Sequence, residues 1–225
     1  MIGFYKARLS GVAAGVVGAV IANLAFAGPA SERVFSRKAL DLLSVGQLVE
    51  YSHTRGGTAG EAVNPISDGQ IRVQVQTAND GSREAEVTMG APGKLRPVSV
   101  WPASAGNPIL PIFLESALRS MSNATGGSTF YIRNRIKDAL GTGGTITTVT
   151  LDVDGASVEA QEIVFALFEN DKNRDRMGAF ADMTLTFVVS EQTPGDIIRF
   201  TAETGDGDTA YREEIAFQGV GSTKE

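Results

Sequence analysis

The sequence predicts an α+β fold: a curved, mainly antiparallel β-sheet of about seven to nine strands, with a helical pair packed on one face. Two observations support this prediction. Apolar residues alternate with polar ones at period two on both sides of the chain's middle, whereas within the middle they recur at helical spacing. Turn signals such as Asp154-Gly155 separate the later segments, so we expect a C-terminal meander there.

The N-terminal segment has the three parts of a secretory signal. The first eight residues contain two basic side chains and no acid, and no residue from Leu9 to Phe26 is charged. Ala25 and Ala27 then place small side chains where signal peptidase requires them. We therefore expect residues 1–27 to be a signal peptide and residues 28–225 to form a single β-rich domain in a bacterial periplasm. The alternative is a retained anchor, because the apolar run of about 18 residues is near the lower limit for spanning a bilayer.

Cleavage after Ala27 is the first testable expectation. The mature protein should begin at Gly28 and keep no stable membrane anchor. N-terminal sequencing of protein from the periplasmic fraction measures this directly. Recovery of membrane-bound chains that still begin at Met1 would replace the signal peptide with an anchor.

Composition excludes some classes of function. The net charge is −6, and removal of Lys6 and Arg8 with the signal peptide makes it −8. This charge disfavours nucleic acid as a partner, because nonspecific binding depends on cationic side chains that displace counterions from phosphate. The chain contains no cysteine, so the exported protein must be stabilised by its core without disulfides.

The first part of the domain is expected to hold a helix, a strand and then a hairpin. Apolar spacing predicts a short helix over Ser31 to Ser44, followed by a strand over Leu48 to Thr54. A glycine-rich loop from Arg55 to Gly69 comes next. Alternation then predicts two strands, residues 71–76 and 83–89, joined by an Asn-Asp-Gly turn.

The middle of the chain is expected to hold the helical pair. A strand over Leu95 to Trp101 comes first, and its proline belongs at a sheet edge or a bulge. Asn107-Pro108 then opens a helix that extends to about Ser122. One of its faces is apolar, and we expect Phe113 on that face to lie in the core. A second apolar stripe after Ser128 predicts another helix, which ends at Gly141.

The last part of the domain is expected to be a run of strands. Alternation returns from Thr145, and short turns separate the strands that follow. Successive strands on short turns form a meander. The expected strands cover residues 145–153, 158–168, 183–189, 197–203 and 211–217.

Three tempting motifs do not meet the requirements of the chemistry that they suggest. His53, the one histidine, has no serine partner in a nucleophile motif, and we expect it at the surface near a strand end. The segment from Asp171 resembles the start of a calcium loop, but Arg176 occupies the obligatory glycine position. The glycines after Arg55 lack the Gly-Lys-Ser/Thr end of a phosphate loop. We therefore predict no catalytic, metal or cofactor site.

One basic cluster is the best candidate for partner binding. Tyr131, Arg133 and Lys137 lie close together on the second expected helix, where residues 133 and 137 share a face. Such a patch suits an acidic partner or a lipid headgroup. The alternative is a solvated helix face whose cations pair with nearby acids, as most charge runs do.

Three functional hypotheses remain. The first is a non-enzymatic exported binding protein that holds a hydrophobic or lipid-like ligand on the concave sheet. The second is a structural or assembly factor that acts through a protein–protein surface or a sheet edge. The third is an enzyme without a recognisable motif. An apolar pocket on the inward face would favour the first hypothesis, and a filled core would favour the second.

Overall fold

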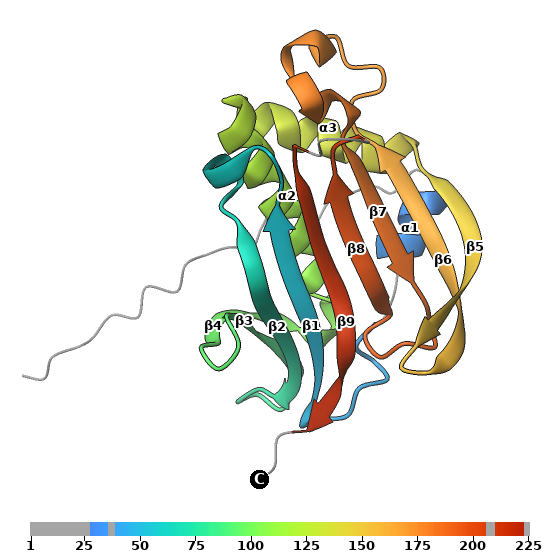
Figure 1. Ribbon diagram of the computed structural model, residues 1–225. Helices are drawn as coiled ribbons and strands as arrows, with labels where there is room; N and C mark the ends of the chain where they lie inside the picture. The colour runs from blue at the N-terminus through green and yellow to red at the C-terminus, as the bar shows by residue number, and fades with distance from the viewer. Residues whose placement is uncertain (1–27, 36–38, 206–209, 223–225) are drawn as a thin grey trace, which may run out of the picture.

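The protein is built on one antiparallel sheet of nine strands, described by a computed structural model that covers residues 28–35, 39–205 and 210–222 (Figure 1). The signal peptide expected at residues 1–27 lies outside the described residues. The strands are β1 (Gln47–Gly56), β2 (Ile66–Thr77), β3 (Arg83–Gly90), β4 (Arg96–Pro102), β5 (Thr145–Val153), β6 (Ala156–Ala166), β7 (Thr184–Val189), β8 (Ile197–Glu203) and β9 (Arg212–Ser222).

Two meanders meet at the centre of the sheet. The strand order is β4-β3-β2-β1-β9-β8-β7-β6-β5, so the first strand pairs with the last. Tyr51 lies opposite Phe217 in that central pairing, and Arg55 lies opposite Glu213. The fold class and the C-terminal meander expected from the sequence are confirmed. The β1–β9 pairing, which joins the two halves, was not expected.

The helical pair covers one face of the sheet, as expected. The helices are α2 (Ile109–Thr125) and α3 (Thr129–Thr142), and in Figure 1 they lie behind the strands. The Asn107 side chain accepts a hydrogen bond from the Ile109 amide at 3.0 Å, which satisfies one free donor at the start of α2. Gly126 ends α2 at φ 67°, a left-handed conformation that suits glycine.

The interior is a layer of apolar side chains between α2 and the sheet. Phe113 of α2 is fully buried, and its ring centroid lies 5.9 Å from that of Phe187 and 5.5 Å from that of Phe200. Phe165 contacts Phe187 edge to face at 5.8 Å. The other buried side chains of α2 are Ile109, Leu114, Ala117, Leu118, Ser120 and Met121. The expected core position of Phe113 is confirmed.

The first helix is shorter than expected. Among the described residues it covers Pro29–Phe35 (α1), and the chain forms turns around residues 39–43. Arg83 on β3 donates hydrogen bonds to the carbonyl oxygens of Leu40 and Leu43. These carbonyls are bound to a guanidinium and do not continue a helical ladder, although both leucines are buried as their spacing suggested.

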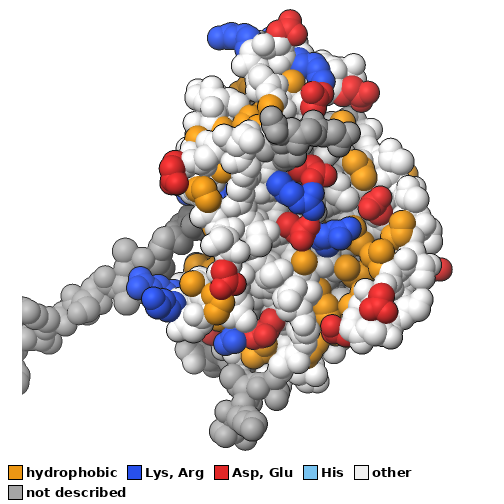
Figure 2. Space-filling model, in the orientation of Figure 1, with side chains coloured by type: hydrophobic (Ala, Val, Ile, Leu, Met, Phe, Trp, Pro, Cys, Tyr) orange, Lys and Arg blue, Asp and Glu red, His pale blue; other side chains and the backbone are white. Residues whose placement is uncertain are grey.

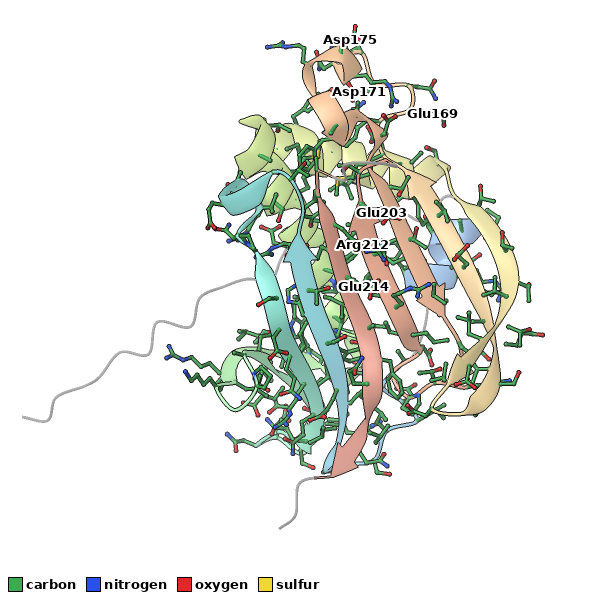
Figure 3. All side chains as sticks on the ribbon, viewed as in Figure 1. Glu169, Asp171, Asp175, Glu203, Arg212 and Glu214 are labelled. Carbon is green, nitrogen blue, oxygen red and sulfur yellow. The ribbon has the colours of Figure 1, made fainter. Side chains whose placement is uncertain are left out.

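The other face of the sheet is polar. Figure 2 shows this face, with basic and acidic side chains gathered near its middle and hydrophobic side chains among them. Arg212 forms ion pairs there with Glu203 and with Glu214, the latter at 2.7 Å (Figure 3). Because one face is polar and the other is covered by helices, the buried groups of interest lie between the sheet and α2. No described helix has the length and apolar character needed to cross a bilayer.

Candidate functional site

A buried carboxylate, Glu213, gathers polar groups from two strands and a helix inside the apolar layer. We call Glu213, His53, Tyr211, Ser116 and Arg55 the Glu213 cluster. The side chain of Glu213 is 0% exposed and that of His53 is 5% exposed. A buried charge is strongly unfavourable unless hydrogen bonds and opposite charges compensate it, so the contacts of this carboxylate determine what the cluster does.

Both oxygens of Glu213 are engaged. Oε1 lies 2.6 Å from Nε2 of His53 and accepts a hydrogen bond from Oγ of Ser116, also at 2.6 Å. A carboxylate oxygen only accepts, so the His53 ring presents Nε2–H to it. Oε2 accepts a hydrogen bond from the hydroxyl of Tyr211. The carboxylate is therefore satisfied from three directions.

Arg55 connects the cluster to the surface. Its Nη1 lies 3.7 Å from Oε1 of Glu213 and donates to Oγ of Ser116 at 2.7 Å. Its Nε and Nη2 donate to the carbonyl oxygen of Asn64, at 2.9 and 2.7 Å. The Arg55 side chain is 14% exposed, so the cluster extends from the buried carboxylate to the edge of the core.

Strand alternation explains why these side chains converge. Tyr51, His53 and Arg55 are alternate residues of β1, so they face the same side of the sheet. Tyr211, just before β9, and Glu213, within it, have the same relation. Burial is the main reason why the pKa of Tyr211 is raised well above its usual value, and the nearby negative charge of Glu213 is the second reason. The phenol therefore stays protonated and donates to Glu213.

The cluster fastens α2 to the sheet. Ser116 is the member that α2 contributes, and it bonds to both a β9 carboxylate and a β1 guanidinium. Serine hydrolases place a histidine on the nucleophilic hydroxyl. Here His53 contacts Glu213, and the Ser116 hydroxyl donates to the carboxylate directly. These contacts therefore form a polar connection between the helix and the two strands.

Two expectations about β1 and its following loop need correction. His53 is buried and bonded to Glu213, and the prediction of a surface histidine was wrong because β1 continues to Gly56. The glycine-rich loop, expected from Arg55 to Gly69, is shorter, because β1 extends to Gly56 and β2 begins at Ile66. The loop packs against the chain that enters β9: the Ala59 amide donates to the Ala210 carbonyl oxygen at 3.0 Å. A Cβ on Gly57 would lie 2.4 Å from that same oxygen.

The segment that resembles a calcium loop has a different structural role. The Asp171 side chain is 2% exposed, and its Oδ1 accepts hydrogen bonds from the Tyr131 hydroxyl at 2.5 Å and the Asn173 amide at 2.7 Å. The segment joins the antiparallel strands β6 and β7, and Asp171 connects it to α3. Asp182 pairs with Arg174. Within the described ranges, no group of three or more potential metal ligands is found.

The expected partner-binding residues differ in what surrounds them. Burial and the Asp171 hydrogen bond raise the pKa of Tyr131, whose hydroxyl is held in that contact. Arg133 pairs with Glu115 of α2 at 3.2 Å, and the neighbouring Arg135 pairs with Asp138 at 2.7 Å. Lys137 is exposed, and no ion pair to it is found in the described part of the chain. Partner binding through Tyr131, Arg133 and Lys137 stays a prediction.

Comparison with known proteins gives no family. No known family and no curated protein matches the sequence. Among solved structures, the Mycobacterium tuberculosis lipoprotein LppX is 11% identical, with a TM-score of 0.35, over 84% of this chain and 93% of that one. An inactive mutant of CurK dehydratase is 10% identical, with a TM-score of 0.19, over 87% of this chain and 82% of that one. These likenesses are too distant to carry an argument, so function must be argued from the chain's own geometry.

Proposed function

We propose that this is an exported, non-enzymatic binding protein that holds a hydrophobic or lipid-like ligand between the concave sheet and α2. In this proposal the α2–α3 pair acts as a lid, and the Glu213 cluster is the latch that holds it on the sheet. The observation that carries the proposal is the placement of an ionic connection inside an otherwise apolar layer. Apolar residues of similar volume are often at least as stabilising as a buried ion pair, so the cluster has a role beyond stability in this proposal.

The layer beneath α2 has the composition of a hydrophobic binding site. Such sites are lined mainly by apolar and aromatic side chains, with a few polar groups that fix orientation. Phe165, Phe187 and Phe200 project from the sheet, and the Glu213 cluster lies in the same layer. An apolar tail would take over the contacts of α2 with these rings as the helix moves outward. The polar end of the ligand would face Arg55, whose side chain is 14% exposed at the edge of the layer.

The connections of the helical pair favour its movement as a unit. The chain approaches α2 through Gly106 at φ 89° and leaves α3 through Gly143 and Gly144, the latter at φ 103°. Hinges are commonly a few residues at element ends that absorb a change in backbone angles. Glu115 of α2 and Arg133 of α3 pair across the two helices, which keeps them together.

The second hypothesis also has a supporting observation. The inward-facing side chains are covered by α2, and Phe113, Phe187 and Phe200 are each at most 1% exposed. A filled layer is what a structural or assembly factor would have. The two hypotheses differ in whether an apolar ligand can displace α2, so a binding experiment separates them.

Titration with the fluorescent fatty acid cis-parinaric acid tests the proposal. We expect saturable binding to the exported protein and tighter binding to the Ser116→Ala variant, because that variant loses the two Ser116 hydrogen bonds that join α2 to β1 and β9. Each of the two hydrogen bonds of Ser116 contributes about 0.5–1.5 kcal/mol, so the apparent Kd should fall by at least roughly twofold.

Arg119→Ala is the matched control. Arg119 lies on the exposed side of the same helix, with a side chain 66% exposed, and should leave the Kd unchanged. An absence of saturable binding would favour the assembly-factor hypothesis over the ligand-binding hypothesis. Equal affinity of wild type and Ser116→Ala would show that the probe does not enter beneath α2.

A further inference from the structure

The two edges of the sheet differ in how they are protected. The edge strand β4 contains Pro97 and Pro102, begins at Arg96, and has a register irregularity in its pairing with β3. Prolines, basic residues and bulges are the devices by which proteins prevent further strand pairing. The other edge strand, β5, has the sequence TITTVTLDV, with no proline, no basic residue and one acid, Asp152. Only one edge is therefore suited to accept a strand.

The β5 edge is long and accessible. Its nine residues pair with β6 on one side, and no described strand pairs with its other side. All nine are exposed or half-buried. Threonine and valine, which dominate the strand, are among the residues that favour extended structure. An edge of this kind presents a row of free backbone donors and acceptors.

We propose that the β5 edge is a dimer interface, where a second copy of this chain adds its own β5 in antiparallel orientation about a two-fold axis at Val149. The inference is independent of the ligand proposed above. The two sheets would then form one continuous sheet across the dimer.

Self-complementarity favours a second copy as the occupant. In the register centred on Val149, Thr148 lies opposite Thr150 of the second copy, and cross-strand threonine pairs are favourable. Asp152 lies opposite Ile146 of the second copy, so the two acids do not face each other. A head-to-tail pairing of β5 with β4 would build an open filament, and the prolines of β4 oppose it. The remaining arrangement is a closed, two-fold dimer.

Sedimentation velocity of the exported protein tests this interface. A single strand pair buries little surface, so we expect a reversible dimer with a Kd between about 1 µM and 1 mM. Thr148→Lys/Thr150→Lys places lysine opposite lysine and should raise the Kd about tenfold or more. The matched control is Val98→Lys/Val100→Lys on β4, which adds the same charge at positions 49% and 53% exposed and should leave dimerisation unchanged.

A charge-swapped mixture tests the register. The Thr148→Glu/Thr150→Glu variant should also dimerise weakly by itself. When it is mixed with the double lysine variant, the two proteins should form a heterodimer, because lysine then lies opposite glutamate. Circular dichroism should show that all variants stay folded. A protein that remains monomeric at about 1 mM would overturn the proposal. So would a dimer that the β5 lysines leave intact, or one that the β4 lysines weaken equally.

Discussion

Replacing Phe113 by alanine is expected to lower the free energy of unfolding by about 3–5 kcal/mol, because the substitution leaves a cavity at the centre of the core. Phe113 is 0% exposed and packs between the rings of Phe187 and Phe200. A helix of this length is marginal alone in water, so α2 depends on burial of this face. Urea unfolding, followed by circular dichroism at constant pH, measures the loss.

The Arg119→Ala variant provides the comparison on the same helix. Its side chain is largely exposed and pairs with Glu115, so the free energy of unfolding should fall by no more than about 0.5 kcal/mol. A Phe113→Ala protein as stable as the Arg119→Ala protein would mean that α2 does not complete the core. The helix would then be an exposed recognition element.

Replacing Glu213 by alanine is expected to lower the free energy of unfolding by about 3–5 kcal/mol. Removing one partner of a buried charged network leaves the other partners uncompensated. His53, Tyr211 and Ser116 would each lose an acceptor, and Arg55 would lose its nearby negative charge. The midpoint of urea unfolding should fall accordingly, and exchange of the α2 amides with deuterium should accelerate because the latch is gone.

The adjacent residue supplies a control with the same side chain. Glu214 follows Glu213 on β9 and therefore points to the polar face, where it pairs with Arg212 (Figure 3). Glu214→Ala should lower the free energy of unfolding by at most about 1 kcal/mol, as expected for the loss of a partly exposed ion pair. If the two alanine variants unfolded at the same urea concentration, the Glu213 cluster would not fasten α2.

Local sequence patterns account for most of the fold. Alternation located most strands, and Asn107 with the apolar stripe that follows it located α2. The pairing of β1 with β9 is set by contacts between residues far apart in the chain, which a local pattern does not contain. The helix over residues 31–44 was overestimated because spacing alone does not show that Arg83 takes the carbonyl oxygens of Leu40 and Leu43.

The candidate site was missed, although part of its signal was present. Glu213 alternates with Tyr211 and Ile215, so the apolar face of the strand expected at residues 211–217 has an acid within it. His53 alternates in the same way with Val49 and Tyr51. Two ionisable residues on inward faces indicate a buried polar contact, but only the β1–β9 register brings them together. Ser116 carried no signal, because a single serine in an amphipathic helix is unremarkable.

Photocrosslinking with a fatty acid that carries a diazirine on its tail tests the central claim most directly. After irradiation with the exported protein, peptide mass spectrometry identifies the labelled residues. The account predicts labels on the inner face of α2 around Phe113 and on the inward side chains of β7 and β8, with more labelling in Ser116→Ala. Labels confined to the polar face around Arg212, or no labels above those on an unrelated protein, would contradict a ligand site beneath α2.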